Sequence, residues 1–163
     1  KQVKLLETGM KNYKNSIINS LHINPDEIPG AGAAGGLGCG LYLAGGVPVS
    51  GSNYILELVE FEKKIKNCSI VITGEGKCDF QTSSGKLPSA IAIKSKKYGK
   101  TVICICGVSA PNDKLYEIGV DGVFSISDKP MSPSYSYNNA SSLIEKLCYN
   151  LGKTLITFKD SLN

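Results

Sequence analysis

The stretch that most constrains this chain is residues 69–88, with the sequence SIVITGEGKCDFQTSSGKLP. A short apolar run ends at Gly74, and acidic, basic, amide and hydroxyl side chains follow at once. Helix-like sequence resumes after Pro88. An order of strand, polar loop and helix places the loop at the carboxyl end of a strand, where open α/β sheets bind ligands. The stretch therefore predicts an α/β fold with a polar site at one edge of its sheet.

The remainder of the chain, from residue 67 onward, repeats this alternation of strand and helix. Connections that contain a helix favour parallel strands and right-handed crossovers. We therefore predict a three-layer, Rossmann-like parallel sheet, with three visible strands that form part of a larger sheet. The expected strands are 69–73, 101–106 and 120–126, and the expected helices are 88–97, 112–118 and 138–158.

The first 66 residues do not fit that alternation. An apolar stripe at helical spacing predicts a helix over 1–21, and a second helix is expected over 53–66. We interpret these helices as belonging to a second α/β domain, with the boundary near Asn67. Because the chain begins at Lys1, inside a helical pattern, we also expect it to be a piece of a longer protein.

A glycine-rich segment, PGAGAAGGLGCG, lies between these two helices. Gly30, Gly32 and Gly35 formally match G-x-G-x-x-G, but a dinucleotide fingerprint needs a strand directly before it, and residues 24–29 do not resemble one. Two interpretations stay open. The small residues permit close helix packing, or their backbone N–H groups face an anion at a helix start.

Composition excludes several classes of function. The net charge is +4, all 18 basic residues are lysines spread along the chain, and this pattern does not favour nucleic-acid binding. No apolar run approaches the roughly 20 residues that cross a bilayer. The six cysteines form no C-x-x-C pair and His22 is the single histidine, so a zinc site is not expected. Free thiols in a reducing compartment, the cytoplasm, fit best.

The polar loop lacks the residues of several common catalytic devices. It has no histidine base for a nucleophile, and Phe80 and Leu87 stand where a Walker A motif needs glycine and Ser/Thr. Glycines, lysines and carboxylates remain. This set suits phosphate, because glycine permits close approach, lysine supplies charge, and Asp or Glu binds magnesium or orients a hydroxyl. A polar surface turn with a capping Asp79 is the alternative.

Several segments together resemble the glycerate kinases of the bacterial two-domain type, which phosphorylate D-glycerate with ATP. Their order and spacing match along nearly the whole chain. The combination of GAGAAGGLG and GEGKxDxQT is specific to that family. The matching segments are 29–38, 70–79, Gln81-Thr82 with Gly85-Lys86, Tyr98-Gly99-Lys100, and 119–126 through Pro130-Met131-Ser132.

The resemblance covers only the C-terminal part of that family's chain. It implies that residues 1–66 are the tail of an inserted middle domain and that 67–163 are the C-terminal portion of the Rossmann-like domain. The active site of these enzymes lies in the cleft between two domains. The resemblance therefore implies that the missing N-terminal part is this chain's partner, that the chain alone is inactive, and that its open sheet edge permits self-association.

The reaction implied by the resemblance is in-line transfer of the γ-phosphoryl of Mg-ATP to glycerate, giving 2- or 3-phosphoglycerate. Asp79 is the first choice for a catalytic or magnesium-linked role, and Glu75 is the second. Lys77 stands where relatives commonly have arginine, and Cys78 where they have an aliphatic residue, so Cys78 is expected to be an inert thiol. The other implied roles are phosphate neutralisation by Lys86 and Lys77, substrate contacts by Gln81 and Thr82, and an anion-facing backbone at Gly30, Gly32, Gly35, Gly36, Gly74 and Gly76.

Two rival functions remain at this point. A dinucleotide-binding domain would rest on Gly30, Gly32 and Gly35, and a strand immediately before Gly30 would favour it. A non-catalytic binding module would keep the sheet but would not transfer a phosphoryl group.

Overall fold

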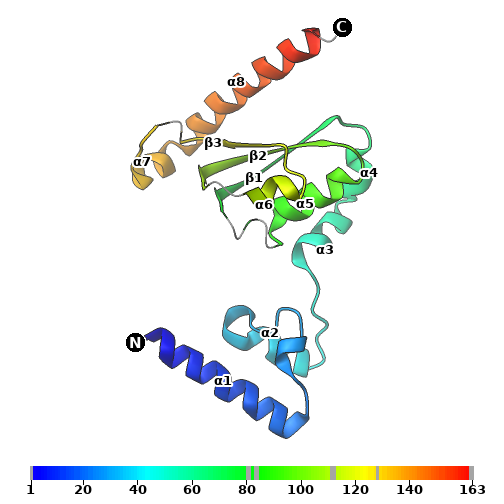
Figure 1. Ribbon diagram of the computed structural model, residues 1–163, viewed down its shortest axis with the longest axis vertical. Helices are drawn as coiled ribbons and strands as arrows, with labels where there is room; N and C mark the ends of the chain where they lie inside the picture. Colours follow the sequence, from blue (N-terminus) through cyan, green and yellow to red (C-terminus); the bar gives the residue numbers. More distant parts are fainter. Residues whose placement is uncertain (1, 80–81, 83–84, 111–112, 128, 162–163) are drawn as a thin grey trace. The chain divides into compact units, whose positions relative to one another are not determined.

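The computed structural model describes residues 2–79, 82, 85–110, 113–127 and 129–161, with side chains to 157. The chain divides into two compact units, Lys1–Ser50 and Gly51–Asn163 (Figure 1). Each unit has its own cluster of buried apolar residues. Among the described residues, no helix combines the length and apolar character needed to span a membrane.

The first unit consists of two helices joined by a short turn. Helix α1 spans Gln2–Leu21, the 3₁₀ helix η1 spans Pro25–Glu27, and α2 spans Ala33–Leu43. Its core is small and centres on Ile17, Ala31 and Cys39. The apolar stripe predicted on α1 is present, but most of it is exposed, including Val3 at 71% and Leu6 at 69%.

The second unit is built on a three-stranded parallel sheet of order β1-β2-β3, which confirms the predicted fold class. Strand β1 spans Ile70–Cys78, β2 spans Thr101–Ser109, and β3 spans Gly122–Ser125. The register pairs Thr73 with Cys104 and Glu75 with Cys106. Because parallel strands in register end at one edge, this pairing brings the residues after β1 and β2 together.

Helices pack around this sheet, and apolar side chains of the shorter ones join its buried core. Figure 1 shows α5 and α6 on one face of the sheet and α8 leading away from it. The predicted stripe on the last helix is its less exposed side, where Leu151 is buried. The helices are α3 (Gly51–Leu58), α4 (Phe61–Ile65), α5 (Leu87–Lys96), α6 (Asp113–Glu117), α7 (Pro133–Asn138) and α8 (Ala140–Ser161).

Two predicted helices are each divided in the structure. The helix expected over 53–66 is α3 and α4, separated by Glu60, whose φ of 51° is left-handed and cannot continue a right-handed helix. The helix expected over 138–158 is mainly α8, because Asn138 is the last residue of α7 and Asn139 separates α7 from α8. Leu56 and Ile65 belong to the core of the sheet unit, and the two compact units divide at Ser50. The domain boundary near Asn67 stays a prediction. The assignment of 1–66 to an inserted domain stays a prediction.

The first strand is longer than predicted, and this correction affects the site. We expected β1 to end at Thr73, but it continues through Gly74, Glu75 and Gly76 to Cys78. A Cβ atom at Gly74 would lie 2.7 Å from the carbonyl oxygen of Ile105 on β2. Glycine here permits close approach of two paired backbones, and the sequence pattern suggested a turn because the two uses of glycine look alike.

Candidate functional site

The polar site lies at the carboxyl end of β1. Glu75 belongs to the strand itself, whereas Asp79 directly follows it. Both carboxylates are largely enclosed, with 15% and 13% of their side-chain surface exposed. Two carboxylates held this close to one strand end are the kind of groups that orient a hydroxyl or share a cation.

Thr82 connects these two acidic residues. Its side chain is fully buried, and its hydroxyl donates a hydrogen bond to Oε1 of Glu75. The Thr82 hydroxyl oxygen accepts a hydrogen bond of 3.1 Å from the backbone N–H of Asp79. The backbone N–H of Thr82 in turn donates to the carbonyl oxygen of Asp79 at 3.0 Å. Thr82 thus closes the turn that follows β1.

Each carboxylate also faces one lysine. The Nζ of Lys86 lies 3.9 Å from Oε2 of Glu75, and the Nζ of Lys77 lies 3.2 Å from Oδ2 of Asp79. The lysine side chains are far more exposed, at 45% and 64%. The ammonium groups therefore stand at the solvent side of the site, where they can meet an anionic ligand, while the acids lie behind them.

The start of α5 positions Lys86. Gly85 adopts φ +99°, a conformation that glycine reaches readily, and Lys86 caps the helix, with its carbonyl accepting from the N–H of Ala90. Ser52 of α3 donates to the carbonyl of Gly85 at 3.4 Å. The N-terminus of α5 places the positive end of the helix dipole at this side of the site.

Three buried thiols lie beneath this site. The Sγ atoms of Cys78 and Cys104 are 3.1 Å apart, and Cys106 is buried on the same strand as Cys104. Burial raises the pKa of the Cys78 thiol, and its contact with Cys104 raises it further. Burial also raises the pKa of Cys104, to which the charge of Glu75 contributes. Thiols held neutral in this way are poor nucleophiles, which agrees with the inert role predicted for Cys78.

Thiol labelling of the native chain should therefore be highly selective. Cys148 on α8 is exposed, whereas Cys39, Cys78, Cys104 and Cys106 are buried. We expect Ellman's reagent at pH 7 to label Cys148 rapidly and the four buried thiols only as the chain unfolds. Cys148→Ser should remove the fast phase, and urea should release all six thiols. Fast labelling of Cys78 in the folded chain would contradict this prediction.

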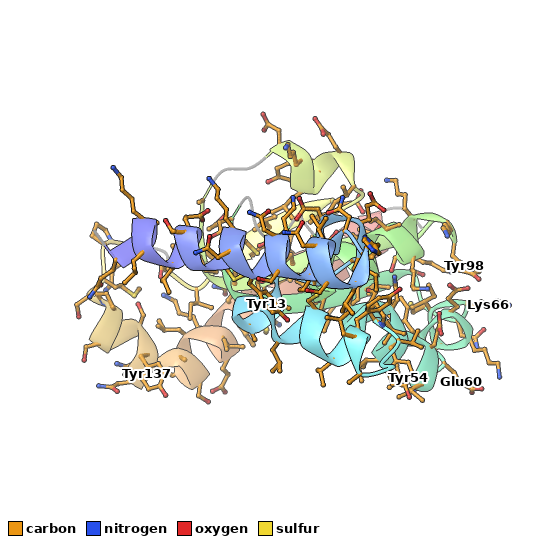
Figure 2. All side chains as sticks on the ribbon, turned by 90° about the horizontal axis from the view of Figure 1, so that it is seen from below. Tyr13, Tyr54, Glu60, Lys66, Tyr98 and Tyr137 are labelled. Atoms are coloured by element: carbon orange, nitrogen blue, oxygen red, sulfur yellow. The ribbon has the colours of Figure 1, made fainter. Side chains whose placement is uncertain are left out.

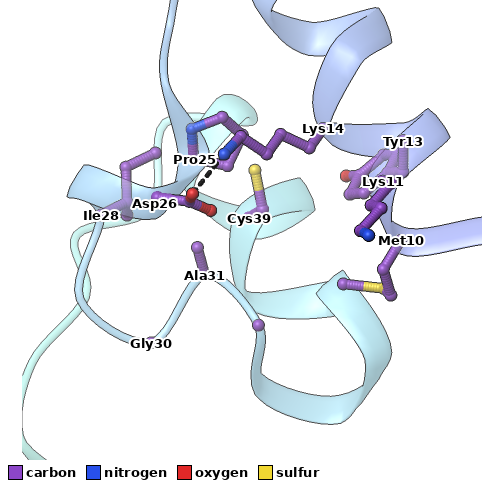
Figure 3. Close-up of a pocket in the computed structure, with 11 residues that line it drawn as sticks. Met10, Lys11, Tyr13, Lys14, Pro25, Asp26, Ile28, Gly30, Ala31 and Cys39 are labelled. Atoms are coloured by element: carbon purple, nitrogen blue, oxygen red, sulfur yellow. Dashed lines mark hydrogen bonds and ion pairs between the residues drawn. The ribbon is translucent and has the colours of Figure 1, made fainter. Parts of the chain in front are cut away.

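The first unit contains a second candidate, a cavity of about 400 Å³ beside the glycine-rich turn (Figure 3). Gly30, Ala31 and Gly32 form one wall, and Cys39 lies at its inner side. Helix α1 supplies the opposite wall. Lys14 of this helix is paired with Asp26, and Lys11 lies three residues earlier on the same helix. The cavity thus combines open backbone with lysine charge. Its further lining residues are Met10, Tyr13, Pro25 and Ile28.

The predicted site residues therefore divide into groups. Glu75, Asp79, Thr82, Lys77 and Lys86 come together in the sheet unit, whereas Gly30 and Gly32 line the cavity of the first unit. Gly36 instead packs under Tyr13, where a Cβ atom would lie 3.0 Å from the ring, and neither it nor Gly35 lines the cavity. Gln81 lies outside the described residues.

Lys11 and Lys14 were missed from the sequence. They flank the apolar stripe of α1, and lysines beside such a stripe usually belong to a solvated helix face. The signal that could have identified them is their spacing of three residues, which places two lysines on one face of the helix.

A further pocket on the sheet unit is lined by polar side chains that bond to one another. The Tyr98 hydroxyl donates to Glu62 at 2.7 Å, and Lys94 pairs with the same carboxylate at 3.2 Å. These two hydrogen bonds lower the pKa of Glu62. Lys66 lies 5.9 Å from the Tyr98 ring centroid, and Figure 2 shows the two side chains at one edge of the molecule. This cluster ties α4 to α5, so we interpret it as structural.

Comparison with known proteins agrees with this description of the fold. The chain is an α/β protein with a parallel sheet and a polar site at the sheet's carboxyl edge. The sequence profile of the glycerate kinase family matches residues 1–156. The chain belongs to the glycerate kinase family.

Its relatives include proteins named as enzymes of this family. The glycerate kinase of Bacillus cereus is 35% identical over 151 residues, and the glycerate 2-kinase of Escherichia coli K12 is 35% identical over 153 residues. These alignments cover 91% and 92% of this chain and 40% of each relative. A crystal structure from Salmonella typhimurium LT2, described as that of a candidate glycerate kinase 2, matches 94% of this chain and 40% of its own, with a TM-score of 0.64 and 31% identity.

The chain thus spans about two fifths of the length of the relatives it matches. One rival function loses its support, because the segment before Gly30 is the 3₁₀ helix η1 and not the strand that a dinucleotide fingerprint needs.

Proposed function

We propose that this chain supplies the C-terminal part of an enzyme that transfers the γ-phosphoryl group of ATP to glycerate. One observation carries the proposal. The carboxylates of Glu75 and Asp79, joined through Thr82 and each faced by a lysine, lie at the carboxyl edge of a parallel sheet. Family membership supports the substrate class. The name of the Escherichia coli relative, glycerate 2-kinase, favours 2-phosphoglycerate as the product.

The proposed division of labour follows from charge and exposure. Asp79 orients the attacking hydroxyl of glycerate and accepts its proton, because its carboxylate is enclosed while one side of it meets Lys77. Lys77 and Lys86 neutralise charge on the transferring phosphoryl group, since their ammonium groups reach the solvent side. Phosphoryl transfer demands mainly positioning and charge compensation, and these residues supply both.

Magnesium fits this arrangement in a specific way. Mg²⁺ in kinases is usually held by one or two carboxylates together with substrate phosphates. Asp79 and Glu75 are the carboxylates that would hold it, and the described residues contain no group of three or more protein ligands that would form a separate cage. When bound, the ion would neutralise phosphate charge.

The glycine-rich cavity is proposed as a second contributor. The exposed backbone at Gly30 and Gly32, with Lys11 and Lys14 opposite, suits an anionic group such as a carboxylate or a phosphate. Glycerate and ATP both carry such groups. A glycerate titration of the chain followed by NMR at these glycines would test this assignment.

Exposed surface on the sheet unit supports the proposal that the rest of the enzyme is a missing partner. Ile72 on β1 is 56% exposed, and β1 and β3 are the two edge strands of the sheet. An exposed edge can pair with further strands. We propose that the remainder of the family's length covers these surfaces and, where it is absent, that copies of the chain associate. The free thiols fit the reducing cytoplasm.

One comparison tests this function. By the complete enzyme we mean this chain preceded by the remaining part of the family's length. We expect the complete enzyme to phosphorylate glycerate with ATP and the 163-residue chain alone to show no turnover. The measurement is product formation from γ-labelled ATP, with and without glycerate. Turnover by the chain alone, or none by the complete enzyme, would contradict the proposal, and the second outcome would favour a non-catalytic binding module.

A further inference from the structure

We propose that Thr82 is a positioning residue, and not a substrate contact, for the phosphoryl transfer. This inference rests on the proposed function. The resemblance to the family suggested Thr82 as a contact for substrate. The structure instead encloses its side chain completely, with no measurable exposure, so the hydroxyl has no surface to offer a ligand.

The hydroxyl already donates its hydrogen and accepts one hydrogen bond inside the protein. It donates its single proton to Oε1 of Glu75 and accepts from the N–H of Asp79. The carbonyl of Lys77 lies further away, at 3.4 Å, and a carboxylate competes better for that proton. A threonine hydroxyl has one donor hydrogen, so a bond to substrate would need the bond to Glu75 to break.

The bond to Glu75 fixes the plane of its carboxylate. Oε1 is held by Thr82, and this leaves Oε2 directed to Lys86. Because the two oxygens are equivalent, a half-turn of the carboxylate changes nothing, but a smaller rotation would break both contacts. Thr82 therefore fixes the orientation in which Glu75 holds the phosphate-facing lysine.

The second bond acts on Asp79 through its backbone. The Asp79 N–H donates to the Thr82 hydroxyl, and the Asp79 carbonyl accepts from the Thr82 N–H. Both backbone polar groups of Asp79 are therefore held by Thr82. One side chain thus sets the positions of both proposed acidic groups. Loss of such supporting hydrogen bonds typically lowers activity by 10- to 100-fold.

The test compares three variants of the complete enzyme. Thr82→Val keeps the shape of the side chain and removes the hydroxyl, whereas Thr82→Ser keeps the hydroxyl. Thr73→Val is the control, because Thr73 is a buried threonine on β1 outside the proposed site. We expect Thr82→Val to lower kcat about tenfold or more, with KM for glycerate and ATP within about twofold of the parent. Thr82→Ser should retain kcat within about threefold, and Thr73→Val should leave it unchanged.

Several outcomes would overturn the inference. A raised KM for glycerate with unchanged kcat would make Thr82 a substrate contact, and equal losses for serine and valine would show that the methyl group matters and not the hydroxyl. If the parent enzyme does not phosphorylate glycerate, the proposed function fails separately. A crystal structure of the Thr82→Val chain then decides the positioning role, because unmoved carboxylates at Glu75 and Asp79 would exclude it.

Discussion

Replacing Asp79 by asparagine is expected to lower kcat of the complete enzyme by at least about a hundredfold. Asparagine keeps the size of the side chain and its place after β1, but it removes the negative charge that faces Lys77. An amide cannot accept a proton from the glycerate hydroxyl, and it is a weaker ligand for Mg²⁺. The measurement is kcat under saturating ATP and glycerate, with the unfolding midpoint of each variant recorded beside it.

A matched control separates this chemistry from general loss of charge. Asp113 lies in the first turn of α6 and is exposed, so Asp113→Asn should leave kcat within about twofold of the parent because it removes the same charge from a solvated position. A kcat that Asp79→Asn leaves unchanged would show that Asp79 only stabilises the turn through its contacts with Thr82. A lowered kcat with a collapsed unfolding midpoint would indicate the same structural role.

Much of the sheet unit could be predicted because its signals are local. Continuous apolar runs such as 101–106 mark strands buried on both faces, and the alternation with helices fixes parallel pairing. The extension of β1 could not be predicted, because it depends on a partner strand more than 25 residues away. Gly74 resembles a turn residue until the carbonyl of Ile105 is placed beside it.

The site was predicted as a set of residue types but not as an arrangement. Glu75, Asp79, Lys77 and Lys86 carry the charges that phosphate chemistry needs, and their proximity follows from their spacing. The burial of Thr82 could not be read from the sequence, because a threonine among polar neighbours predicts an exposed loop. Its role emerges only when the turn after β1 folds its side chain back onto Glu75.

The glycine-rich segment shows why its two interpretations stayed open at the sequence level. Packing and anion binding both require small residues, so composition does not separate them. In the structure, Gly36 and Gly38 lie against Tyr13 and the Gly30 carbonyl, whereas Gly30 and Gly32 line the cavity. The later glycines thus allow the packing that shapes the cavity, and the earlier ones leave its backbone open.

Because Gly38 packs against the Gly30 carbonyl, we expect Gly38→Ala to destabilise the glycine-rich turn strongly. The added Cβ atom would lie 2.2 Å from the carbonyl oxygen of Gly30, a backbone atom that cannot rotate away, so the turn has to open. Overpacking of this kind costs about 1–3 kcal/mol or more. The hydrogen bond from the Cys39 N–H to the Ala31 carbonyl, 3.1 Å long, should then weaken. Hydrogen exchange at Cys39 measures this directly in the 163-residue chain.

Gly40→Ala is the matched control, two residues further along the same helix. There a Cβ atom would meet only the Tyr13 hydroxyl at 3.8 Å, an ordinary contact, and alanine stabilises a helix by about 1 kcal/mol relative to glycine. Exchange at Cys39 should therefore speed up in Gly38→Ala and stay the same or slow down in Gly40→Ala. If both variants exchange alike, the close approach of Gly38 to Gly30 does not hold the turn. If Gly38→Ala also raises KM in the complete enzyme while its unfolding midpoint stays close to that of the parent, and Gly40→Ala does not raise KM, the cavity lined by Gly30 and Gly32 belongs to the substrate site.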